Sequence, residues 1–98
     1  MTPHNLLDQL KKNSLIIQGQ RVFRDTDVAA MYRISPSKLR SVLKRHPSHF
    51  PPDFLIKQDG FVFLTEGGVL MISSVLKTPL ADQISVGIVR ELFNFPNN

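Results

Sequence analysis

The basic residues of this chain are concentrated in one stretch, residues 33–57. Six basic residues against a single acid, Asp53, give the stretch a net charge of +5, whereas the whole 98-residue chain carries only +4. The six are Arg33, Lys38, Arg40, Lys44, Arg45 and Lys57. Guanidinium and ammonium groups that lack acidic neighbours bind phosphates, such as those of the DNA backbone. The stretch therefore predicts a localised face that binds a polyanion.

A helix over residues 36–45 must position most of these cations. Ser35 is a favourable N-cap, Pro36 suits the first helical position, and Pro47 disfavours helix at the residue before it. At 100° per residue, one arc of this helix is apolar and the opposite arc is polar or basic, without an acid. The central residues of the polar arc are Ser37, Ser41 and Lys44, and the flanking residues are Lys38, Arg40 and Arg45. We expect the central groups to reach base edges and the flanking cations to meet phosphates; the alternative is an ordinary solvated basic face.

The elements on either side of this helix predict a winged helix-turn-helix arrangement. A preceding helix is expected to start with Asp25 or Thr26 as its cap and to end at Tyr32, and a turn of about three residues joins the two helices. Downstream, two apolar strands, 54–57 and 61–64, flank the loop Gln58-Asp59-Gly60 and predict a hairpin in the position of a wing. Lys57 and Gln58 are then expected to approach the DNA backbone or minor groove, unless the hairpin only completes the sheet.

The remaining segments are expected to form the scaffold of one α+β domain over residues 1–98. A short helix is predicted within residues 1–13, and a first hairpin is predicted with its turn at Gly19-Gln20. A helix capped by Thr65 continues to Lys77 and is apolar around almost its whole circumference, which predicts burial on nearly all sides. Residues 96–98 are expected to be a loose end.

The last helix is predicted to begin with Thr78 as its cap and Pro79 at its first position. Its main apolar stripe suffices for the core, and a second apolar group lies on another side. This second group is Val86, Val89 and Phe93. We interpret it as a possible partner surface and, because groove-reading proteins often act as symmetric dimers, as a possible homodimer interface.

Composition and spacing argue against several other classes of protein. The chain has no cysteine, which excludes disulfides, thiol catalysis and cysteine zinc sites. His46 and His49 have no further ligand at suitable spacing, so we expect neither a metal nor a cofactor, and no grouping of residues indicates an enzyme or a small-molecule substrate. The longest apolar run is far too short to cross a membrane, and we expect a cytoplasmic protein.

The order of these residues resembles a known family. The blocks VAAMYRISPSKLRSVLKRHPSHFPPDF and LTEGGVLMISSVLKTPLADQISVGIVRELF resemble the phage and bacterial open-reading-frame-six N-terminal domain, a relative of the KilA-N domain. The resemblance covers roughly residues 15–95. Its features are the Ala30-x-Tyr32 pair, Lys44-Arg45, Phe50-Pro51-x-Asp53-Phe54, Thr65-Glu66-x-Gly68-Val69 and Ile88-Val89-Arg90-x-x-Phe93.

The resemblance implies a DNA-binding domain of phages, prophages and other mobile elements, often fused to an antirepressor or regulatory domain. This chain departs from the pattern because the segment between the two blocks is only a hairpin, and we expect no second domain after residue 95. The second departure indicates a stand-alone regulator, or a domain whose effector partner is a separate chain. The leading hypothesis is a transcriptional regulator that binds double-stranded DNA. The alternative is an antirepressor or adaptor that binds a separate regulator protein through its last helix or its basic face.

Overall fold

The computed structural model describes the backbone of residues 3–93 and the side chains of residues 6–90. The predicted α+β class, with a helix-turn-helix between two hairpins and two helices at the end, is confirmed. In chain order the elements are α1 (Pro3–Lys12), β1 (Leu15–Ile17), β2 (Gln20–Arg24), α2 (Asp25–Tyr32), α3 (Pro36–Arg45), a 3-10 turn η1 (Pro47–His49), β3 (Leu55–Gln58), β4 (Phe61–Thr65), α4 (Glu66–Leu76) and α5 (Pro79–Phe93).

The two hairpins form one antiparallel sheet in the order β1-β2-β4-β3. The hairpins meet where β2 pairs with β4, with Val22 opposite Thr65. Both tips are two-residue turns in which both residues have positive φ, Gln18-Gly19 (54° and 77°) and Asp59-Gly60 (54° and 81°). This is the turn geometry whose twist matches that of paired strands, and glycine adopts it without strain.

The predicted turn positions were therefore wrong by one residue. A single glycine in each loop is compatible with more than one register, and strand pairing selects the register in which glycine takes the second turn position. The first turn is Gln18-Gly19 and not Gly19-Gln20, because Gln20 pairs with Ile17 as part of β2. In the second hairpin, Gln58 pairs with Phe61 and belongs to β3, not to the loop.

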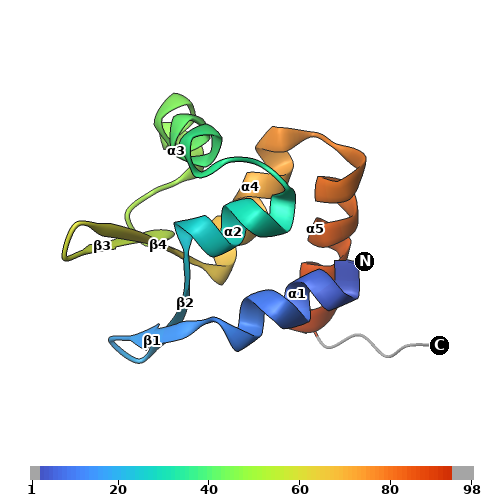
Figure 1. Cartoon of the computed structure of the whole chain (residues 1–98), viewed down its shortest axis with the longest axis horizontal. Helices are drawn as coiled ribbons and strands as arrows, with labels where there is room; N and C mark the ends of the chain where they lie inside the picture. Colours follow the sequence, from blue (N-terminus) through green and yellow to red (C-terminus); the bar gives the residue numbers. More distant parts are fainter. Residues whose placement is uncertain (1–2, 94–98) are drawn as a thin grey trace.

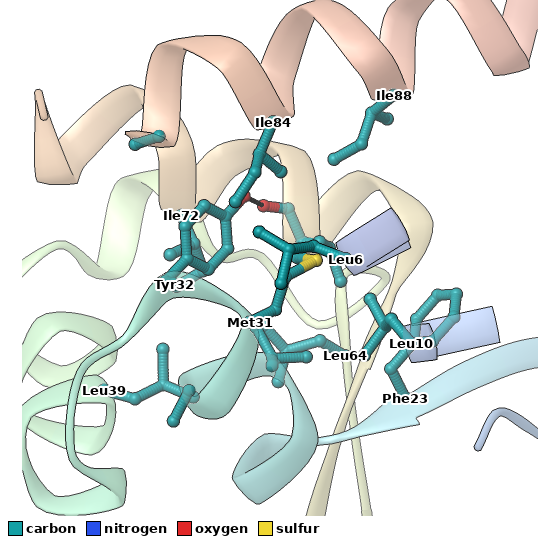
Figure 2. Close-up of a cluster of buried hydrophobic side chains, with 14 of the residues drawn as sticks. Leu6, Leu10, Phe23, Met31, Tyr32, Leu39, Leu64, Ile72, Ile84 and Ile88 are labelled. Atoms are coloured by element: carbon teal, nitrogen blue, oxygen red, sulfur yellow. Dashed lines mark hydrogen bonds between the residues drawn. The ribbon is translucent and has the colours of Figure 1, made fainter. Parts of the chain in front are cut away.

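The helices pack around a core on one side of this sheet. In Figure 1, α2 lies at the centre, α1 and α5 lie together on one side, and both hairpin tips point to the other side. Figure 2 shows side chains from α1, β2, α2, β4, α4 and α5 converging, with Tyr32 close to Ile72 and Ile84. The Tyr32 hydroxyl donates a hydrogen bond to the Val69 carbonyl at 2.7 Å, which links α2 to α4. Burial raises the pKa of this hydroxyl well above its usual range.

Helix α4 has the central position that its sequence predicts. The Thr65 hydroxyl accepts a hydrogen bond from the Gly68 N–H at 3.2 Å, as expected of an N-cap. Among the residues of α4 only Ser74 is exposed, while Ile72 is fully buried. The helix ends at Leu76, one residue before the predicted Lys77.

The prediction of a side-chain cap for α2 was wrong. The helix begins at Asp25 itself, after Arg24, and Arg24 provides no capping hydrogen bond. The Asp25 carboxylate accepts a hydrogen bond from the Thr26 N–H at 2.8 Å. Asp25 is buried, and an acid in the first helical turn is stabilised by the positive end of the helix dipole.

Candidate nucleic-acid interface

Helix α3 stands at the edge of the molecule, and it has the predicted bounds. Its N-cap Ser35 accepts a hydrogen bond from the Lys38 N–H at 3.1 Å, and Pro36 is its first residue. Leu39 and Val42 are buried on the side that faces α2. Figure 1 shows α3 projecting away from α4 and α5 on the side of the hairpin tips. The sequence predicts where this helix begins and ends, because the signals at both ends are local.

The opposite face of α3 is open to solvent. Of the three residues predicted at its centre, Ser41 is half-buried. Ser37, Lys38, Arg40, Lys44 and Arg45 are exposed. The structure therefore brings the six residues predicted for this face together on one surface, and α3 contains no acid.

Arg33 lies at the turn that leads into α3. Its backbone is left-handed, with φ 60° and ψ 41°, and it ends α2 as the C-cap. The N–H groups of Arg33 and Ile34 donate to the carbonyls of Ala30 and Ala29 at 3.1 and 3.0 Å. Such a turn is most often made by glycine, whereas here it presents an exposed guanidinium beside the start of α3.

The cations on this surface differ in whether they already have a partner. Arg40 Nε lies 3.2 Å from Asp25 Oδ2. Within residues 6–90, Arg33, Lys38, Lys44 and Arg45 make no ion pair. Four cations are thus available to a polyanion. Arg40 is instead paired with Asp25, a partner that the sequence did not predict.

The second hairpin presents its two predicted residues on opposite faces. Lys57 pairs with Val62, and two residues earlier Leu55 pairs with Leu64, so Lys57 shares the face of the sheet that covers the core. Gln58 pairs with Phe61 and points to the other face. Both Lys57 and Gln58 are exposed, but strand alternation allows only Lys57 to lie on the helix side of the sheet.

Phe61 is an exposed aromatic that the sequence did not single out. It is 66% exposed and lies directly after the turn at Gly60. The run 61–64 is apolar throughout, so no alternation separated the buried Leu64 from the exposed Phe61.

The two histidines after α3 pack against each other. The rings of His46 and His49 form an edge-to-face contact with their centroids 5.6 Å apart. His49 Nδ1 is buried and has no hydrogen-bond partner. Among the described residues, no three histidine, aspartate or glutamate side chains come together as metal ligands would.

The predicted partner surface on α5 is described only in part. Val86 is 50% exposed, and Val89 is half-buried. Phe93 lies outside the described side chains. Thr78 caps the helix as predicted, because its hydroxyl accepts a hydrogen bond from the Ala81 N–H at 3.1 Å.

A comparison with protein-family models, curated proteins and solved structures finds no match. The resemblance to the open-reading-frame-six N-terminal domain therefore stays a prediction from the residues that carry it. In the part of the chain that the structure describes, no helix has the length and apolar character needed to cross a membrane.

Proposed function

We propose that this protein is a DNA-binding transcriptional regulator of a phage or mobile element that reads duplex DNA with α3. The observation that carries the proposal is the exposed face of α3 together with the adjoining turn. Four cations of this surface make no ion pair with the side chains of residues 6–90, and α3 itself contains no acid. A solvated helix surface ordinarily mixes both signs of charge. The face of α3 carries positive charge only, which favours a surface that binds a polyanion over an ordinary solvent-exposed one.

The major groove is about 12 Å wide and admits one α-helix. In the proposed complex α3 enters this groove, and Ser37, Ser41 and Lys44 face the base edges. Lys38 and Arg45 then meet phosphates on the two walls, and Arg33 meets the backbone beside the helix start. Helix α2 braces α3 from behind through Leu39 and Val42.

The hairpin β3–β4 has the position of a wing in this proposal. Lys57 lies on the helix side of the sheet and is the hairpin residue that meets a phosphate beside the groove. Gln58 faces away from that side, so it makes no contact in the same binding mode. The protein performs no chemistry and acts by occupying its site, with assignment to a phage or mobile element resting on the family resemblance alone.

The test is a binding titration on a random duplex pool at low salt, followed by selection of the bound sequences. The double variant Lys38→Ala/Arg45→Ala should lower affinity at least tenfold and lower the salt slope by about two, since each phosphate contact contributes about 0.9. Arg21→Ala/Arg90→Ala is the matched control, because it removes the same charge from exposed positions outside α3. Equal affinities for the two double variants would contradict the proposed face.

A protein-interaction module is the second candidate, and the exposure of Val86 and Phe61 favours it. In that case capture of a partner should be insensitive to salt and should be lost in Val86→Asp, whereas duplex binding should be weak and unaffected by Lys44→Ala. Sedimentation at micromolar concentration tests a homodimer through the same helix. A monomer mass for the wild type would exclude it.

A further inference from the structure

Asp25 and Arg40 connect the two helices of the helix-turn-helix. Asp25 is the first residue of α2, and Arg40 lies in the middle of α3. Asp25 Oδ2 accepts a hydrogen bond from Arg40 Nε at 3.2 Å, and Oδ1 accepts one from the Thr26 N–H at 2.8 Å. One carboxylate therefore holds the N-terminus of α2 and the outer face of α3 at once.

The two sides of this pair are unequally exposed. The side chain of Asp25 is 11% exposed and that of Arg40 is 53% exposed. A buried carboxylate that loses its charged partner is left uncompensated, so the pair resists separation more than an exposed ion pair would. Arg40 is consequently anchored at its Nε, while about half of its side chain is exposed.

Helix α3 needs such an anchor because little else fixes its direction. It packs chiefly against α2, through Leu39 and Val42. Apolar contacts along one stripe hold a helix down but permit small rotations and slides, whereas a hydrogen-bonded ion pair is directional. In the proposed complex a shift of α3 by a fraction of an ångström changes which base edges its side chains reach.

We infer that Arg40 is a positioning residue and not a phosphate ligand: Asp25 and Arg40 together fix the orientation in which α3 is presented to DNA. The inference rests on the proposed function and deepens it. The phosphates are then left to Arg33, Lys38 and Arg45. It also explains why an acid can lie beside a surface that binds a polyanion, because the Arg40 guanidinium compensates the negative charge of Asp25.

The inference and its opposite predict effects of different sign for Asp25→Asn. If Arg40 were a phosphate ligand, Asp25→Asn would release it and remove a nearby negative charge, so DNA affinity would rise. If the pair positions α3, Asp25→Asn and Arg40→Gln should each lower affinity for the selected sequence by roughly tenfold, within the range of coupling expected between contacting residues. The double variant should bind no more weakly than either single variant.

Two further readouts separate positioning from charge and from general stability. The salt slope of Arg40→Gln should change by less than half of the 0.9 expected for one phosphate contact. The ratio of specific to non-specific affinity should fall in both single variants, because non-specific binding depends on charge more than on helix orientation. Asp82→Asn, at an exposed position of α5, is the control that changes the same charge elsewhere.

Amide hydrogen exchange without DNA completes the experiment. Asp25→Asn and Arg40→Gln should each speed exchange in α3 and leave exchange in α4 unchanged, which also verifies that both variants fold. Higher affinity in Asp25→Asn, or a salt slope lowered by about one unit in Arg40→Gln, would overturn the inference while the proposed function stands. Absence of duplex binding by the wild type would overturn the proposed function itself, and unchanged exchange in α3 would show that the pair fixes nothing.

Discussion

Helices α3 and α4 begin in the same manner and occupy opposite environments. Ser35 caps the first through the Lys38 N–H at 3.1 Å, and Thr65 caps the second through the Gly68 N–H at 3.2 Å. Yet α3 buries one stripe and exposes a basic face, whereas only Ser74 is exposed on α4. The caps decide where a helix starts, and the distribution of polar residues around it decides how deep it lies.

Helix α2 is connected to both of these helices by hydrogen bonds of different kinds. Tyr32 at its C-terminal end donates to the Val69 carbonyl inside the core. Asp25 at its N-terminal end accepts from Arg40 at the surface. The comparison predicts that substitutions toward α4 change stability and that substitutions toward the outer face of α3 change binding.

The largest effect on stability is expected for Ile72→Ala. Ile72 is fully buried in α4, and removing its side chain leaves a cavity in the centre of the core. The free energy of unfolding should fall by about 2–5 kcal/mol. Urea unfolding followed by circular dichroism measures it, and a loss below about 1 kcal/mol would contradict the central place of α4.

Gly68→Ala should also destabilise, although alanine is usually the better helix residue. A Cβ at Gly68 would lie 2.6 Å from the backbone oxygen of Phe54, which cannot move without disturbing the sheet edge. We expect a loss of about 1–3 kcal/mol. Gly87→Ala is the matched control, because its Cβ would meet only the end of the Leu7 side chain, at 2.7 Å, and that methyl group can turn away. Equal losses in the two variants would show that the Phe54 carbonyl is not the obstacle.

Tyr32→Phe should cost about 1 kcal/mol near neutral pH, the typical contribution of one hydrogen bond. Burial raises the pKa of Tyr32 in the folded state because it disfavours the charged phenolate. In the unfolded chain the pKa of this hydroxyl is about 10. The stability that the hydroxyl contributes is therefore present below about pH 10 and is lost as the pH rises further. The difference in unfolding free energy between wild type and Tyr32→Phe should stay constant below about pH 9 and shrink above about pH 10. Other groups that titrate in this range cancel in that difference, and a difference that stays level up to about pH 11 would contradict the raised pKa.

The smallest effect on stability is expected for Lys44→Ala. Lys44 is exposed on α3 and makes no ion pair within the described side chains. The free energy of unfolding should change by less than about 0.5 kcal/mol. A larger loss would mean that the basic face of α3 supports the fold, and the contrast with α4 would then fail.

Local signals made α3 predictable and left its main ionic contact hidden. Ser35, Pro36 and Pro47 act on their immediate neighbours, so the sequence predicts the bounds of α3 as the structure has them. The partner of Arg40 lies 15 residues earlier, at Asp25. The sequence predicts Asp25 or Thr26 as a helix cap. The contact between the Asp25 carboxylate and the Arg40 guanidinium was not predictable, because it depends on how the two helices pack.

The strands were predictable as apolar runs but not in their exact pairing. One glycine per turn, Gly19 and Gly60, fits two registers, and the choice depends on the cross-strand partners. The exposure of Phe61 was hidden for a related reason. Residues 61–64 of its strand are all apolar, so the sequence does not show that the tip of this hairpin extends beyond the helices that cover the rest of the sheet (Figure 1).

Two helices of this protein end on a basic residue in the left-handed conformation, Arg33 after α2 and Lys77 after α4. Glycine in these places would relieve backbone strain of about 1 kcal/mol each. At Lys77 that relief would remove a side chain that belongs to neither α3 nor the turn before it, whereas at Arg33 it would remove a cation beside the start of α3. Selection for a more heat-resistant version of this protein would therefore be free to act at one helix end and constrained at the other.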